Sequence, residues 1–232
     1  MFDPLPNPRV FGVPPGADFP AAVVAGVLDR MANAPPEALA RVRIFVNTQR
    51  MRRRLVALFQ QGPARQLPRI DLITDAGRFI PDASLSEVAP ALQRKLELAA
   101  LIAPLLESDA APAPRSAMFD LADSLAALLD ELHSEGVPPE RILELDVGDH
   151  SEHWVRSQQF LSIVQKYLAQ SGASFQDVEA RRRTAMELQT DAWQRAPPEA
   201  PVLVVGSTGS RGTTFELMRS VARLPQGAVV LP

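Results

Sequence analysis

Residues 201–222 read Pro201-Val-Leu-Val-Val-Gly-Ser-Thr-Gly-Ser-Arg-Gly-Thr-Thr-Phe-Glu-Leu-Met-Arg-Ser-Val-Ala222, and this stretch decides the fold. The run from Val202 to Val205 is apolar throughout, which is typical of a parallel strand covered on both faces. Gly206, Gly209 and Gly212 then mark a turn, and the hydroxyl side chains between them favour the start of a helix. A strand, a turn and a helix in this order build open α/β sheets, which bind ligands at the carboxyl ends of their strands.

The composition is that of a globular protein. The chain has 232 residues, of which 46% are hydrophobic, enough for one large domain or two small ones. It has no cysteine, so disulfides and cysteine-ligated metal centres are excluded. No apolar run approaches the ~18 residues that span a membrane and no signal peptide is present, so we expect a cytoplasmic protein without a membrane partner. The net charge of -3 means that any nucleic-acid contact must come from local basic patches.

Strand and helix patterns alternate in the first third of the chain. Short apolar runs predict strands, and amphipathic segments predict helices. In chain order these are the strand Arg9-Val-Phe-Gly, a helix over 21–31, the strand Arg43-Ile-Phe-Val-Asn, a helix over 48–60 and the strand Arg69-Ile-Asp-Leu-Ile-Thr. Such an alternation predicts a parallel sheet.

The middle of the chain has a different pattern. From Ser86 to about Trp193 the helical period dominates, and Phe119 and Trp193 fall on helical stripes that predict core positions. The strand pattern returns after Pro197-Pro198. We therefore expect an α/β protein in which residues 1–85 and 196–232 form the sheet core and residues 86–195 form an inserted helical subdomain.

The segment Gly12-Val-Pro-Pro-Gly-Ala-Asp-Phe follows the first expected strand, where a phosphate-binding loop would lie. Such a loop needs the pattern G-x-x-x-x-G-K-[ST], because backbone N–H groups hold the phosphate and Lys neutralises it. The Lys is missing here, and Pro14 and Pro15 remove two N–H donors. After Val205 no acidic pair is available for magnesium. We expect no ATP hydrolysis and no bound cofactor, although nucleotide binding at the turn from Gly206 to Gly209 stays open as an alternative.

The strongest positive signal is a basic helix that follows a strand. Arg50, Arg52, Arg53 and Arg54 lie within about one and a half helical turns, directly after the polar pair at the strand end. Such a helix can grip a nucleic-acid backbone through its side chains and its N-terminus, or it can be a solvated face. The predicted DNA-binding residues are Asn47, Thr48, Arg50, Arg52, Arg53 and Arg54. A second run, Arg181 to Arg183, follows two acids and favours i,i+4 ion pairs instead.

Metal chemistry has little support in the sequence. His150 and His153 have helical spacing, but no third ligand accompanies them or His133. The carboxylates Asp71, Asp75 and Asp82 are spread along the chain, whereas two-metal hydrolysis needs acids that converge on one site. We expect no metal site and no catalytic residue.

Several blocks of the sequence resemble one family. The blocks are Leu67-Pro-Arg-Ile-Asp, Leu121-Ala-Asp-Ser-Leu-Ala-Ala-Leu-Leu-Asp-Glu-Leu-His, Gly206-Ser-Thr-Gly-Ser and Arg223-Leu-Pro-Gln-Gly-Ala-Val-Val-Leu-Pro. They are similar to the N-terminal part of AddB, the double-strand break repair subunit of the AddAB helicase-nucleases, in its alphaproteobacterial form. The segment from Arg43 to Leu55 also resembles the strand–helix motif of superfamily-one helicases, in which Thr or Asn at the strand end touches single-stranded DNA.

The resemblance implies a degenerate RecA-like, P-loop helicase-like domain with a helical insertion and without ATP turnover. It implies a role in homologous recombination, with single-stranded DNA or duplex DNA ends and an AddA-like helicase-nuclease subunit as partners in a heterodimer. On this resemblance Asn47 and Thr48 are the foremost strand contacts, and the arginines of the basic helix come next. A pure protein-interaction module, with the insertion docking the partner subunit, is a further alternative.

Overall fold

The computed structural model describes residues 1–3, 7–80, 85–107, 114–138, 141, 175–176 and 178–232. The chain divides into two compact units, one formed by Met1–Pro81 and Ala185–Pro232 and the other by Asp82–Thr184. Helix α7 (Val178–Arg195) starts in the second unit and ends in the first. Both borders therefore lie earlier in the chain than the sequence predicts, at residue 81 instead of 85 and at residue 185 instead of 196.

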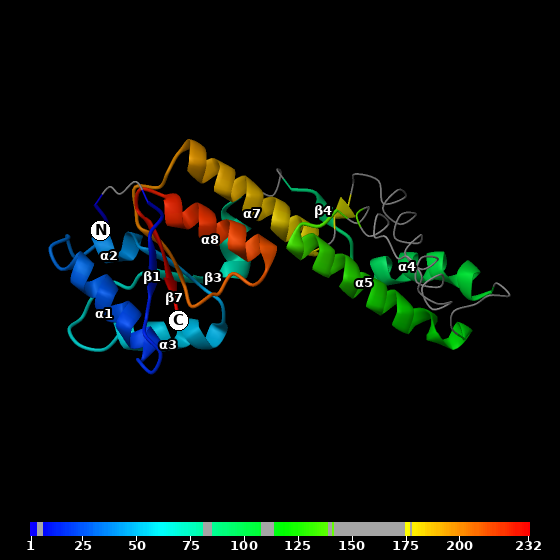
Figure 1. Ribbon diagram of the computed structural model, residues 1–232, viewed down its shortest axis with the longest axis horizontal. Helices are drawn as coiled ribbons and strands as arrows, with labels where there is room; N and C mark the ends of the chain where they lie inside the picture. The colour runs from blue at the N-terminus through cyan, green and yellow to red at the C-terminus, as the bar shows by residue number, and fades with distance from the viewer. Residues whose placement is uncertain (4–6, 81–84, 108–113, 139–140, 142–174, 177) are drawn as a thin grey trace. The chain divides into compact units, whose positions relative to one another are not determined.

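A five-stranded parallel sheet forms the centre of the first unit (Figure 1). In spatial order its strands are β1 (Val10–Gly12), β7 (Gly227–Leu231), β6 (Val202–Val205), β2 (Arg43–Val46) and β3 (Arg69–Leu72). All of the pairings are parallel. The predicted α/β class is confirmed, and the four strands predicted above correspond to β1, β2, β3 and β6.

Different helices cover the two faces of this sheet. The helices of the unit are α1 (Phe19–Met31), α2 (Ala38–Arg41), α3 (Gln49–Phe59), the 3-10 helix η1 (Ile73–Phe79), the second half of α7, and α8 (Gly212–Arg223). Side chains alternate along a strand, so on β2 Ile44 and Val46 pack with α1 and α3, whereas Phe45 packs with α7 and α8. All three are fully buried. The central strands are thus covered on both faces, as their apolar sequences require.

The second unit is mainly helical. Its described elements are the strands β4 (Glu87–Val88) and β5 (Phe175–Gln176), the helices α4 (Ala91–Leu106) and α5 (Met118–Glu135), the 3-10 helix η3 (Arg115–Ala117) and the start of α7. Helices α4 and α5 share a core centred on Leu98, Ile102, Leu125 and Leu129. Phe119 is 44% exposed, so its predicted core position is wrong, because the buried stripe of α5 runs along a neighbouring face.

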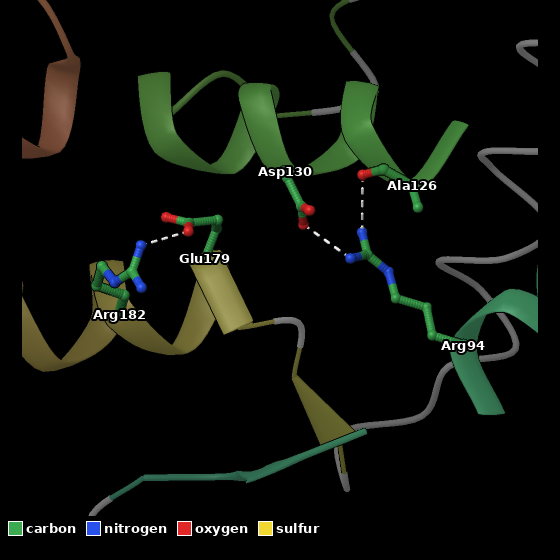
Figure 2. Close-up of polar contacts among 5 residues, drawn as sticks. All are labelled: Arg94, Ala126, Asp130, Glu179 and Arg182. Carbon is green, nitrogen blue, oxygen red and sulfur yellow. Dashed lines mark hydrogen bonds and ion pairs between the residues drawn. The ribbon is translucent and has the colours of Figure 1, made fainter. Parts of the chain in front are cut away.

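Arg94 ties α4 to α5 (Figure 2). One guanidinium nitrogen, Nη1, lies 2.8 Å from Oδ1 of Asp130, and the other, Nη2, donates to the carbonyl oxygen of Ala126 at 3.1 Å. A guanidinium that leaves water needs such partners, because an uncompensated buried charge is strongly destabilising. The pair therefore fixes how these two helices pack.

Two arginines of the second run, Arg182 and Arg183, contact other parts of the second unit. Arg182 pairs with Glu179 on the same helix (Figure 2), so the predicted ion pair exists, at spacing i,i+3 instead of i,i+4. The guanidinium of Arg183 lies against Gly136, which ends α5 in a left-handed conformation with φ of 70°. A cation at that place interacts favourably with the negative end of the α5 dipole. This run stabilises the second unit.

Candidate nucleic-acid interface

The predicted strand contacts lie at the carboxyl edge of the sheet. Because all five strands are parallel, the segments that follow β1, β2 and β6 meet at this edge. Strands β2 and β6 are neighbours, yet the chain continues from β2 to β3 on one side and from β6 to β7 on the other. A reversal of this kind is a topological switch point, and ligands of open α/β sheets bind in the crevice outside it.

Asn47 lies at this switch point. It is exposed and directly follows β2, and its Oδ1 atom is 3.8 Å from the position that a Cβ atom of Gly206 would occupy. Gly206 has a φ of 74° and brings the backbone after β6 close to the amide, which a residue with a side chain could not do without displacing Met51 and Phe19. The fold thus brings together Asn47 and the turn Gly206–Gly209, two features far apart in the sequence.

Helix α3 starts at the same place for clear local reasons. Thr48 is its N-cap, and the threonine hydroxyl accepts a hydrogen bond from the N–H of Met51 at 3.2 Å. Leu55 and Phe59 anchor the helix in the core and are fully buried. The helix N-terminus with its partial positive charge is therefore held at this edge of the sheet.

The four predicted arginines of α3 are all exposed. Arg52 and Arg54 are about 160° apart around the axis at roughly 100° per residue, so the arginines cover the outer half of the helix instead of forming one row. The first turn has no acidic residue. Arg50 lies in this turn, where a cation opposes the dipole by about 0.3–1 kcal/mol, so the dipole does not favour an arginine there. The arrangement concentrates positive potential beside the crevice.

Arg54 has an internal partner. Its Nη2 atom lies 3.1 Å from Oδ2 of Asp18, the N-cap of α1, and both side chains are about half exposed. Asp18 also accepts the N–H of Ala21 through Oδ1, at 3.2 Å. The N-terminal end of α1 is therefore connected to the middle of α3. The ion pair with Asp18 involves Arg54 and none of the other three arginines of α3, which are Arg50, Arg52 and Arg53.

The loop before α1 is a poor phosphate cradle. A phosphate at a helix N-terminus is held by free backbone N–H groups. Here the Asp18 carboxylate occupies one of them, and Pro20 lies within the first helical turn and has no N–H to offer. Pro14 and Pro15 remove two more donors, and the N–H of Val13 is used in the sheet, donating to Leu231. A negatively charged side chain thus takes the place where a nucleotide phosphate would bind.

The turn after β6 also differs from the expectation. Arg211 is the N-cap of α8 and makes no capping side-chain hydrogen bond. Ser207 is buried and accepts the N–H of Gly209 at 3.3 Å, so it stabilises the turn and not the helix. The expected capping by Ser207, Thr208 or Ser210 is therefore wrong, because the helix starts later than the hydroxyl cluster.

Two further arginines, Arg43 and Arg69, lie away from this edge. Burial lowers the pKa of the Arg43 guanidinium, with Arg69 acting in the same direction and Asp71 against it. Arg43 and Arg69 are the first residues of β2 and β3, at the opposite edge of the sheet. Within the described residues no group of three or more His, Asp or Glu side chains could hold a metal ion. His150 and His153 lie outside that part of the chain.

Two features of the edge escaped the sequence analysis. The role of Asp18 as a cap could have been found from the pattern Asp18-Phe-Pro, which places an N-cap residue before a proline in the first turn. The second feature is Phe215, which is 53% exposed on α8. Its exposure was not predictable from the sequence, because an aromatic residue in an amphipathic helix usually lies in the core.

The described residues contain no helix long and apolar enough to cross a membrane. Comparison with protein-family models and with curated proteins finds no match for this chain.

Proposed function

We propose that this chain is a non-catalytic, helicase-like domain of the AddB type, with a degenerate RecA-like core, that contacts single-stranded DNA and scaffolds an AddA-like motor subunit. The observation that carries the proposal is the juxtaposition of Asn47 with the Gly206 turn at the switch point, beside the exposed arginines of α3. The loop before α1 supports a domain that does not turn over ATP, because the Asp18 side chain accepts the backbone N–H of Ala21 at the place where a phosphate would bind.

Binding to DNA would rest on two kinds of contact. Arg50, Arg52 and Arg53 would neutralise backbone phosphates, which gives affinity without sequence preference. Asn47 has an amide that both donates and accepts, and at the end of β2 it would meet sugar or base. Thr48 caps α3, and its hydroxyl hydrogen would still be available to a phosphate oxygen.

The second unit offers support for the scaffolding role. Leu92 and Leu96, one helical turn apart on α4, are 68% and 51% exposed, and Phe119 of α5 lies under the ammonium group of Lys95. Exposed apolar side chains of this size, gathered on one helical hairpin, are typical of protein–protein contact sites. They favour a partner subunit on the insertion.

The first prediction concerns the basic helix. Replacing Arg50, Arg52 and Arg53 by Ala should weaken binding of the full chain to labelled oligothymidine at least tenfold at low salt. Because about 0.7 counterions are released per phosphate contact on single strands, the slope of log K against log salt should fall by about 2. Fluorescence anisotropy at four salt concentrations measures both quantities.

The matched control removes the same charge elsewhere. Arg41, Arg219 and Arg223 are exposed and lie in α2 and in the second half of α8, towards the opposite edge of the sheet. Their replacement by Ala should leave affinity and slope nearly unchanged. Equal losses in both variants, or no DNA binding by the unaltered chain with or without its partner subunit, would contradict the proposed DNA contact.

The second prediction concerns the pair formed by Asp18 and Arg54. Asp18→Asn keeps an N-cap residue but removes the carboxylate charge that competes with phosphate for Arg54. We expect DNA affinity to rise about three-fold, because an exposed pair is worth up to about 1 kcal/mol. In an Arg54→Ala background the same change should have little effect, and an equal rise there would show that only net charge matters.

A further inference from the structure

One aromatic side chain at the carboxyl edge is not needed by the core. Helix α8 buries Leu217, Met218, Val221 and Ala222, which pack on the sheet. Phe215 lies in the first turn of the same helix and is 53% exposed. About half of the side chain is left in water, although full burial of a phenylalanine is worth about 1.5–3 kcal/mol, and this exposed half is accessible to a ligand.

Phe215 is connected to the crevice by the Gly206–Gly209 turn. A Cβ atom at Gly209 would lie 3.5 Å from the ring carbon Cδ2 of Phe215, and the other end of the turn lies beside Asn47. Gly209 has a φ of 69°, which favours glycine, so the backbone of the turn passes directly along the ring. Asn47 and Phe215 thus lie beside the two ends of the same turn, of which Thr208 is exposed.

The surroundings of the ring are polar. Thr208, Ser210 and Arg211 are all exposed on the turn that leads to the helix. The neighbouring acid, Glu216, lies 3.6 Å from Arg219, which offsets its charge. An exposed ring that follows exposed hydroxyl groups and a cation in the sequence suits a flat ligand that carries phosphate.

We infer that Phe215 stacks on an unpaired base of the bound single strand, with Arg211 contacting the adjacent phosphate. This inference rests on the proposed function and extends the DNA path from α3 across the switch point to α8. Stacking is tolerant of sequence, because every base has a π face, and it requires the base to be unpaired. The site should therefore favour single strands over duplex DNA.

The experiment compares Phe215→Ala with Val178→Ala, an apolar residue with the same exposed fraction of 53% in the second unit. In the full chain Phe215→Ala should lower affinity for oligothymidine about tenfold, within the range found for loss of one stacked base. The salt slope should stay unchanged, because no phosphate contact is lost. Val178→Ala should bind like the unaltered chain, and Phe215→Trp should retain binding.

Two further readouts separate stacking from apolar contact and from misfolding. An oligonucleotide with one 2-aminopurine should lose fluorescence on binding the unaltered chain but not the Phe215→Ala variant, and far-UV circular dichroism should be the same for both. Full affinity of Phe215→Leu, or of Phe215→Ala while the α3 arginine variant loses binding, would overturn this inference alone. Absence of DNA binding by the unaltered chain would overturn the proposed function together with it.

Discussion

Replacing Gly227 by Ala should unfold or severely destabilise the sheet unit. A Cβ atom at this position would lie 1.9 Å from the carbonyl oxygen of Val221 and 2.8 Å from Cβ of Leu224. Real Cβ atoms do not approach a backbone oxygen so closely, and the oxygen belongs to the last turn of α8, so it cannot rotate away. We expect a loss of about 3–5 kcal/mol, at the upper end of the cost of overpacking.

The reason for this close approach is the tight connection from α8 to β7. The N–H of Gly227 donates to the carbonyl oxygen of Leu224 at 3.0 Å, which closes a turn with Pro225 in its second position. The strand must start directly under the helix end, because β7 lies between β1 and β6 and cannot shift along either neighbour. Relief of the clash would therefore move α8 off the sheet.

Trp193 gives a direct measurement for this unit. Its ring lies 6.3 Å from that of Phe45 between centroids, and it is buried. The chain has two tryptophans, so in a Trp154→Phe background the fluorescence reports on Trp193 alone. Urea unfolding should show a much lower midpoint for Gly227→Ala. Gly12→Ala is the matched control, because nothing lies within 4 Å of its new Cβ atom, and a similar loss there would contradict the steric argument.

The sequence predicted those parts of the fold in which local pattern and burial agree. The run from Val202 to Val205 is apolar at every position because the strand is central and covered on both faces, and the amphipathic α3 has one buried stripe. Elements whose role depends on distant chain segments were not predictable. Strands β4 and β5 pair Glu87 with Phe175, and each strand has only two residues. Two residues are too few to show the alternation that predicts a strand.

The same distinction holds for the candidate site. Asn47 and the α3 arginines were predictable, because a polar pair and a basic run follow a strand in sequence. The position of Asn47 beside Gly206 depends on the strand order, which places β2 next to β6 although more than a hundred residues separate them. The pairing of Arg54 with Asp18 likewise follows from the packing of α1 against α3 and from no local signal.

Arg9 shows how a charge can be structural without a charged partner. It is 6% exposed, and its Nη1 atom donates to the carbonyl oxygen of Leu224 at 3.0 Å and to that of Gly227 at 3.5 Å. Nη2 donates to the carbonyl oxygen of Asp3, and the guanidinium lies 5.2 Å from the ring centroid of Phe2. The carbonyl oxygen of Leu224 lies at the end of α8 and carries the negative end of the helix dipole. Together with the carbonyl oxygens of Gly227 and Asp3 it compensates the buried cation, of which only Nε has no hydrogen-bond partner.

Arg9→Ala should therefore cost about 2–4 kcal/mol, because it removes charge-assisted hydrogen bonds and leaves a cavity beside the turn that Gly227 closes. Arg9→Met is the informative comparison. It fills most of the volume and needs no compensation, and buried charges can often be replaced by apolar groups of similar size at little cost. We expect Arg9→Met to retain most of the stability in the Trp193 assay. If Met costs as much as Ala, the guanidinium is essential, and the hydrogen bonds to the α8 end outweigh the desolvation of the charge.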